Sequence, residues 1–193
     1  MKFEIHQPCE QLRPYVKHFI ISENDEMLKY NVIPGTSLVM GFQYSGQLSY
    51  LDNDLEIPLA TAGVTGLMDT CRTFKNQLLT GTVLVVFQET GATHFFTNPV
   101  NELFRESIAL EHIFNNAELR KAEELLSTAT NDASRIKVIE LLLLNHLHNI
   151  PADLLVNKAI QYIYHSKGTI RISELAYKLN TRKKISPGCW SFS

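Results

Sequence analysis

The spacing of apolar residues changes near Pro99, and this change limits the chain to folds that combine a sheet with helices. Over residues 37–44, apolar side chains alternate with smaller or polar ones, the period of two that marks a half-buried strand. Residues 82–88 are rich in β-branched side chains and apolar on both faces, which predicts a central strand. Turn residues recur between such runs at short intervals. Several short antiparallel strands at this spacing predict a barrel or a sandwich, to which residues 11–19 would add either a short helix or an edge element.

After Pro99 the apolar residues follow a helical period. Residues 103–114 predict one or two short helices that pack on the strands, and residues 117–127 form a clearer amphipathic helix. Asn131 is a suitable N-cap for a longer helix that reaches about His148.

The longer helix is apolar around much of its circumference, so it needs packing partners on more than one side. Core packing within the chain is one explanation and a dimer interface is the other. The spacing of three, four and four residues selects the candidates for dimerisation, which are Ile136, Ile139, Leu143 and Leu147.

Charge is distributed unevenly. Residues 1–150 carry 11 Lys/Arg and 18 Asp/Glu, whereas residues 151–193 carry seven Lys/Arg and two Asp/Glu, so the net charges are −7 and +5. A basic segment attracts phosphate backbones whatever their base sequence, which suggests a nucleic-acid partner; a solvated basic tail is the alternative.

The basic segment predicts two helices. Asn149 to Pro151 marks a boundary, after which residues 153–166 form a helix that ends at Gly168. Ser173 is a candidate N-cap for a second, short helix that ends near Thr181. A helix, a short connection and a second compact helix are how a helix-turn-helix unit begins.

Two stretches resemble the AraC/XylS family of bacterial transcriptional regulators: residues 170–181, IRISELAYKLNT, and residues 87–114, FQETGATHFFTNPVNELFRESIALEHIF. The resemblance implies an α+β chain in three parts. Residues 1–100 would form a cupin-like antiparallel β-barrel that senses an effector, residues 101–150 a helical dimerisation or linker segment, and residues 151–193 a truncated AraC-type helix-turn-helix. The implied partners are DNA, a small-molecule effector and a second copy of the chain.

The end of the sequence departs from the family pattern, because Pro187 and Gly188 interrupt the region where a recognition helix would follow. We therefore expect an incomplete DNA reader whose contacts with phosphates do not specify base sequence. Its vestigial DNA-binding residues would be Ser173, Thr181, Arg182, Lys183 and Lys184. The expected function is the effector-sensing and dimerisation portion of a regulator with impaired sequence-specific DNA binding. The alternatives are a stand-alone ligand-binding module that acts through protein partners, and a metal-dependent cupin enzyme.

An effector pocket inside the barrel would be apolar with a few polar anchors. The same side chains would otherwise simply fill the barrel. The candidates, with Arg72 or His94 as the anchor, are Met40, Phe42, Tyr50, Arg72, Phe74, Phe87 and His94.

Catalysis, cofactors and a membrane location are not expected. His146 and His148 form the one His-x-His pair, and in a helix these positions point apart and do not share an ion. The sequence has no nucleophile elbow, phosphate-binding glycine loop or HExxH motif. No apolar run approaches the roughly 18 residues of a membrane span. The three cysteines form no CxxC pair, and reduced thiols are typical of the cytoplasm.

Overall fold

The computed structural model describes residues 1–53, 55–96 and 99–181. The chain divides into two compact units, Met1–Asn149 and Ile150–Ser193. The first contains antiparallel sheets and two α-helices, and the second contains two more α-helices in its described part. None of the helices in the described ranges combines the length and the apolar character that a membrane span requires. The α+β class, with strands first and helices after them, is confirmed.

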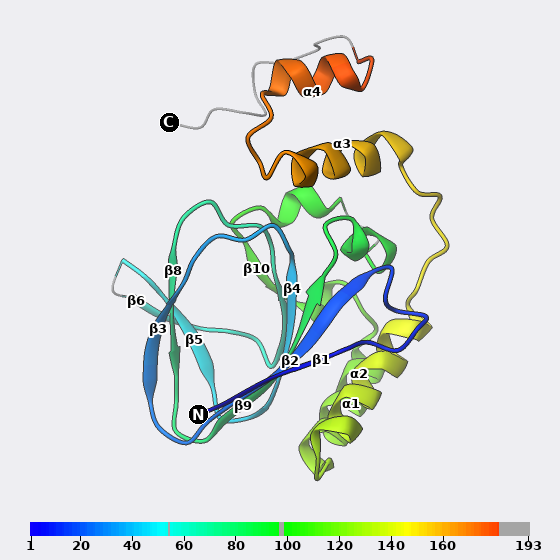
Figure 1. The fold of residues 1–193 in the computed structure, drawn as a ribbon. Coiled ribbons are helices and arrows are strands. Elements are labelled where there is room, and N and C mark those ends of the chain that lie inside the picture. The colour runs from blue at the N-terminus through cyan, green and yellow to red at the C-terminus, as the bar shows by residue number, and fades with distance from the viewer. Residues whose placement is uncertain (54, 97–98, 182–193) are drawn as a thin grey trace. The chain divides into compact units, whose positions relative to one another are not determined.

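Two antiparallel sheets form the first unit (Figure 1). The larger sheet has six strands, in the order β1 (Lys2–His6), β2 (Val16–Asn24), β9 (Thr80–Phe87), β4 (Val39–Ser45), β7 (Ala62–Thr65) and β10 (Ser107–Ala109). The smaller sheet has four strands, in the order β3 (Leu28–Val32), β8 (Arg72–Asn76), β5 (Leu48–Asp52) and β6 (Leu55–Pro58).

The strands expected from the spacing of apolar residues are present. β9 lies between β2 and β4, so the prediction of a central strand over 82–88 is confirmed. β4 alternates buried and half-buried residues as predicted. Residues 11–19 are neither a helix nor an edge element, because a turn closed by a hydrogen bond from Val16 N–H to the Leu12 carbonyl leads directly into β2, which is paired on both sides.

Helices follow the strands and begin at polar caps. The 3₁₀-helices are η1 (Gly91–His94), η2 (Val100–Leu103) and η3 (Leu110–His112), and the α-helices are α1 (Asn116–Thr128), α2 (Asp132–Asn145), α3 (Leu154–His165) and α4 (Ile172–Lys178). The Asn131 side chain accepts a hydrogen bond from Ser134 N–H at 2.9 Å, so the predicted cap of α2 is confirmed. The prediction of one or two short helices over 103–114 was wrong at Ile108, which lies in β10 and pairs with Val64.

The hydrophobic core lies between the large sheet and the helices. Phe19, Phe42 and Phe87 project from β2, β4 and β9 and are at most 1% exposed. Phe95 and Phe96, which follow η1, bring their rings to 5.5 and 6.0 Å from the Phe87 ring. Aromatic rings at these separations attract one another in addition to burying apolar area. The outer face of the large sheet is therefore covered by the helical part of the unit.

The four residues proposed for dimerisation belong to this core. Ile139 and Leu143 are fully buried, Ile136 is 8% exposed, and Leu147 is half-buried against the same cluster. The structure thus corrects their assignment to a dimer interface, because their side chains are already packed within the core of one chain. Dimerisation itself stays a prediction that does not rest on these residues.

The second unit is a helix pair. The Asp153 carboxylate caps α3 by accepting hydrogen bonds from the N–H groups of Leu155 and Val156. Gly168 ends the helical turn with a φ of +77°, a conformation that glycine adopts without strain. Ser173 is not the N-cap of α4, because the helix already begins at Ile172 and its N-cap is Arg171. No residue of α3 or α4 is buried.

The packing of α2 predicts different costs for two identical substitutions. We expect Leu143→Ala to lower the free energy of unfolding by about 2–5 kcal/mol, because it opens a cavity in the core. Leu141→Ala should change it by no more than about 0.5 kcal/mol, because Leu141 is 50% exposed on the same helix. Urea unfolding followed by circular dichroism measures both values. Equal losses in the two variants would contradict the placement of α2.

Gly91 predicts a second contrast. A Cβ atom there would lie 1.9 Å from the Tyr15 carbonyl oxygen, whereas one at Gly35 would meet nothing within 4 Å. Gly91→Ala should therefore destabilise the protein by about 1–3 kcal/mol through overpacking, and Gly35→Ala should be nearly neutral. Thermal denaturation of the two variants tests this. A Gly91→Ala variant as stable as the wild type would show that the two segments do not cross so closely.

Candidate functional site

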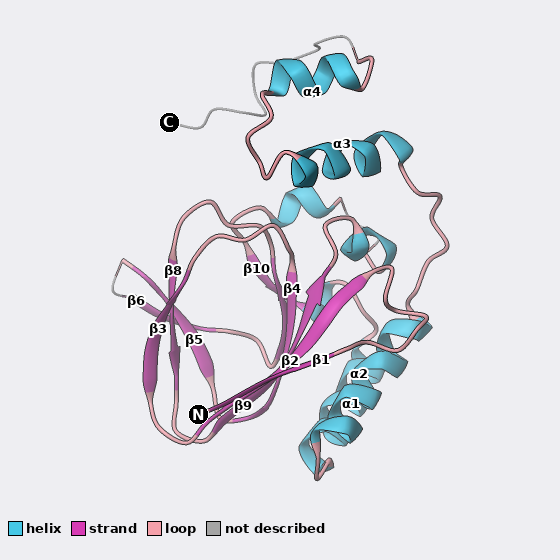
Figure 2. Cartoon of the chain, in the orientation of Figure 1, coloured by secondary structure: helices cyan, strands magenta, loops and turns pink. Residues whose placement is uncertain are grey.

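A cavity of about 960 Å³ lies between the two sheets of the first unit. Figure 2 shows the two groups of strands that enclose it. Residues from every strand of both sheets line it, together with the loop over residues 33–37. Pockets that hold small organic molecules have volumes of roughly 300–1,000 Å³, so the cavity is large enough for such a ligand.

On β4 the side chains that face the cavity are smaller than those on the opposite face. From β4, the residues that line it are Val39, Gly41 and Gln43. A Cβ atom at Gly41 would lie 3.3 Å from the Leu84 side chain, a tight contact that the glycine avoids. The large side chains Met40 and Phe42 project to the opposite face, into the core beneath the helices.

The wall from the small sheet is mostly aromatic and aliphatic. Tyr30 of β3 and Phe74 of β8 stack with their ring centroids 6.0 Å apart, and both line the cavity. Burial raises the pKa of the Tyr30 hydroxyl, so this phenol stays neutral. Leu48 and Ile57 extend the apolar surface.

Arg72 supplies a fixed positive charge in this wall. Its Nη1 donates a hydrogen bond to the Ser107 hydroxyl at 2.8 Å, and its Nη2 donates one to the Arg105 carbonyl oxygen at 2.9 Å. Its guanidinium carbon lies 4.4 Å from the centroid of the Tyr50 ring, within the range of a cation–π contact. Arg72 therefore joins β8 of the small sheet to β10 of the large one.

A second arginine holds the backbone that Arg72 contacts. Arg105 has a φ of +63°, and its guanidinium forms two hydrogen bonds with the Asp69 carboxylate, one of them from Nε at 2.7 Å. The Arg105 guanidinium lowers the pKa of Asp69, so the pair stays charged at neutral pH. The Arg105 N–H also donates to the Leu67 carbonyl oxygen at 2.9 Å, which ties the two loops beside Arg72 together.

The structure divides the predicted pocket residues into two groups. Tyr50, Arg72 and Phe74 line the cavity. Met40, Phe42, Phe87 and His94 do not, and their placement is corrected here.

Most of these residues lie outside the cavity because their side chains project from the opposite face of the large sheet. The first three of these corrected residues lie on the face of the large sheet that the helices cover, because the bulkiest apolar side chains pack there. His94 lies in η1, with its ring 4.6 Å from the Tyr15 ring and its Nδ1 3.2 Å from the His148 carbonyl oxygen. Effector binding by the lining residues stays a prediction.

Other residues that line the cavity were not predicted from the sequence. Leu84 and Val86 of β9 face the cavity, and so does Ser107 of β10. The period of two identified both faces of β9 but not which one would face the helices. The smaller side chains on one face of β4 were the available signal.

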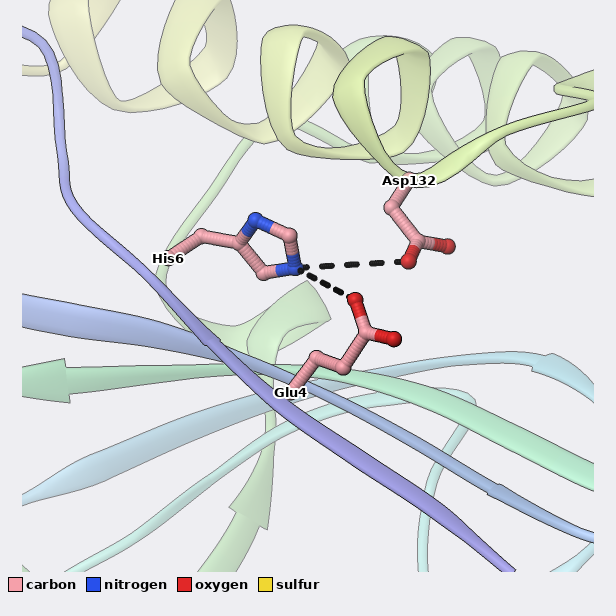
Figure 3. A group of neighbouring side chains, drawn as sticks. All are labelled: Glu4, His6 and Asp132. Carbon is pink, nitrogen blue, oxygen red and sulfur yellow. Dashed lines mark ion pairs between the residues drawn. The ribbon is translucent and has the colours of Figure 1, made fainter.

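Glu4, His6 and Asp132 form a separate group outside the cavity (Figure 3). Positions 4 and 6 share a face of β1, and Asp132 is the first residue of α2. The Nε2 atom of His6 lies 3.6 Å from Glu4 Oε2 and 4.0 Å from Asp132 Oδ2. One ligand atom from each residue lies within 4.8 Å of the others, which is the arrangement that a bound cation requires.

Two basic side chains already occupy this position. Lys2 Nζ lies 2.6 Å from Asp132 Oδ2 and 3.4 Å from Glu23 Oε2, and Arg135 Nη1 lies 3.3 Å from Asp132 Oδ1. The hydrogen bond to Asp132 raises the pKa of Lys2, so its ammonium group remains charged. We therefore assign the group to an ion-pair network that joins β1 to α2 rather than to a metal centre.

The structure describes two of the five predicted DNA-binding residues. Ser173 lies in the first turn of α4, and Thr181 follows the helix and donates a hydrogen bond from its hydroxyl to the Ala176 carbonyl oxygen at 3.2 Å. Arg182, Lys183 and Lys184 lie outside the described residues.

Several solved structures are similar to the chain. ToxT from Vibrio cholerae, in its apo K231A form, is 12% identical, with 88% of this chain and 73% of that chain covered at a TM-score of 0.46. The AraC-like transcriptional activator CuxR is 10% identical, with coverages of 85% and 67% and a TM-score of 0.36. A predicted oxalate decarboxylase from Thermotoga maritima is 10% identical, with coverages of 45% and 79% and a TM-score of 0.32. At these TM-scores the likenesses carry no argument about function.

Comparison at the level of sequence gives one family. No curated protein matches the chain. The family described as domain of unknown function DUF6597 matches residues 4–109, a span that reaches from β1 to the end of β10 and so includes both sheets. Because this match covers more than half of the chain, the protein belongs to the DUF6597 family.

Proposed function

We propose that the chain is the ligand-sensing portion of an AraC-type transcriptional regulator, with the cavity between the sheets as its effector site. The observation that carries the proposal is the cavity itself, about 960 Å³ in volume, whose wall is mostly apolar and also carries hydroxyl and amide side chains and the Arg72 guanidinium. Sites for small molecules have this composition, because apolar walls supply affinity and a few polar groups fix orientation.

The sequence segments that resemble the AraC/XylS family support the regulatory part of the proposal. Residues 87–114 form the end of β9, the 3₁₀-helices and β10, which is the passage from the sheets to the helices. Gly91 of this segment packs against the Tyr15 backbone so closely that no side chain fits. Residues 170–181 include α4, the second helix of the basic unit. These positions support the proposal, because the resemblance expects the first segment to lead from the barrel into the helices and the second to begin a helix-turn-helix.

Binding rather than catalysis is the proposed role of the cavity. A metal-dependent cupin enzyme needs several His and carboxylate ligands that point into one barrel. Among the described residues that line the cavity there is no His, Cys, Asp or Glu. The residue types present therefore support a site that holds a molecule without reacting with it.

Weak recognition of DNA completes the proposal. Reading of bases needs a helix whose side chains reach into the major groove. Of the residues predicted to contact DNA, Ser173 and Thr181 are polar and uncharged, and the region after α4 contains Pro187 and Gly188, which oppose a continuing helix. The net charge of +5 in residues 151–193 supports contacts with phosphates.

Occupation of the cavity can be tested with an uncharged apolar fluorophore, N-phenyl-1-naphthylamine. We expect its fluorescence to rise when it binds to the full chain. Val86→Trp should weaken this binding on the order of tenfold or more, because the indole fills part of the space that the ligand needs. Val86 lines the cavity from β9.

Leu141→Trp is the matched control, because it adds the same side chain to the exposed surface of α2. It should leave fluorophore binding unchanged, and circular dichroism shows whether both variants are folded. The proposal fails if the wild type does not bind the fluorophore or if a folded Val86→Trp variant binds it equally well.

Recognition of DNA is tested by selection from a pool of duplexes with random sequence. We expect the full chain to retain DNA at low salt through phosphate contacts and to lose it as the salt concentration rises. At about 150 mM salt, the selection should enrich no sequence motif. Enrichment of a motif would contradict the proposal of impaired sequence reading, and the retention at low salt serves as the positive control.

A further inference from the structure

The cavity wall is positively charged in an otherwise acidic part of the chain. Residues 1–150 have a net charge of −7, yet no described residue that lines the cavity is Asp or Glu, and the charged side chains among them are those of Lys17 and Arg72. One carboxylate, that of Glu89, lies beside the wall, where it accepts a hydrogen bond from the Thr36 hydroxyl at 3.2 Å and faces Lys17. A ligand with a negative charge would therefore meet its attraction at Arg72, which forms no ion pair with a carboxylate in the described part of the chain.

The two cations differ in how far they are neutralised. Lys17 Nζ lies 4.0 Å from a Glu89 carboxylate oxygen. Arg72 has no carboxylate within 4.0 Å in the described part of the chain, and its partners are a hydroxyl, a carbonyl oxygen and an aromatic ring. These partners orient the guanidinium but leave its charge without a counter-ion.

The guanidinium also retains donors. It carries five N–H groups, and the contacts with Ser107 and Arg105 occupy one on each of its terminal nitrogens. Arginine binds planar carboxylates through paired hydrogen bonds, which are stronger than bonds between neutral groups. Because its side chain is already held by Ser107 and Tyr50, Arg72 loses little conformational freedom when it binds an anion.

Away from Arg72, the wall favours an apolar molecule. Ile20, Leu84 and Val86 face the cavity from the large sheet, and Leu48, Ile57 and Phe74 face it from the small sheet. Such walls attract hydrocarbon because both surfaces leave water. A ligand that satisfies both parts of the cavity has a negative group at one end and an apolar body.

We propose that the cavity binds an amphipathic monocarboxylic acid, with the carboxylate on the free N–H groups of Arg72 and the apolar body between the sheets. This inference rests on the proposed function only in requiring that the cavity takes a ligand. It adds the chemical class of that ligand and the residue that selects it.

Three probes with the same decyl chain separate the contribution of the headgroup from that of the tail: decanoate, decanol and decylamine. Titration calorimetry on the full chain should give decanoate an affinity on the order of 10- to 100-fold higher than that of decanol, the effect of a charge-assisted hydrogen bond. Decylamine should bind more weakly than decanol, because Arg72 repels it.

Variants assign the preference to a residue. Arg72→Gln should reduce the affinity for decanoate to that for decanol and leave decanol binding unchanged. Lys29→Gln removes a positive charge from β3 at an exposed position that does not line the cavity, so it should keep the full preference. Lys17→Gln should keep it as well.

The outcomes distinguish this inference from the proposed function. Equal affinities for decanoate and decanol in the wild type overturn the carboxylate assignment and leave a ligand-binding cavity. Loss of the preference in Lys17→Gln but not in Arg72→Gln overturns the role of Arg72. No binding of any probe, together with no binding of N-phenyl-1-naphthylamine, overturns the proposed function and this inference with it. The comparison in the wild type decides the ligand class even if Arg72→Gln does not fold.

Discussion

Packing of the helices against one face of the large sheet determines the rest of the first unit. Phe19, Phe42 and Phe87 are buried beneath the helices, and burial of such side chains is the main favourable contribution to folding. With the largest apolar residues on this outer face, the face toward the small sheet carries smaller ones, such as Gly41 and Val86. The core therefore lies outside the pair of sheets, and the space between them remains open.

This arrangement separates stability from ligand binding. The contacts of α2 and the aromatic cluster around Phe87 stabilise the unit without contributions from the cavity. Most side chains that line the cavity lie outside this core, although Val64 and Ile108 belong to both. Arg72 shows that the wall can hold a charged group, because neighbours from β10 and β5 orient its guanidinium.

The sequence predicted the positions of strands and helices better than it predicted which face of each would be buried. The period of two over 37–44 and the apolar run over 82–88 correspond to β4 and β9, and the polar residue Asn131 marked the start of α2. These signals are local, because strand alternation and helix capping involve residues close in sequence. The candidate site was predicted only at Tyr50, Arg72 and Phe74, since a period of two defines two faces and does not state which of them another element will cover.

By itself the sequence determined an α+β chain with strands before helices and an acidic first part joined to a basic second part. It also determined which residues share a face, because alternation along a strand is fixed by backbone geometry. Only the tertiary structure decided that Met40 and Phe42 face the helices, that the stripe on α2 is core, and that a cavity remains between the sheets. Those outcomes depend on contacts between residues far apart in the chain, and no local pattern records how such surfaces compete for burial.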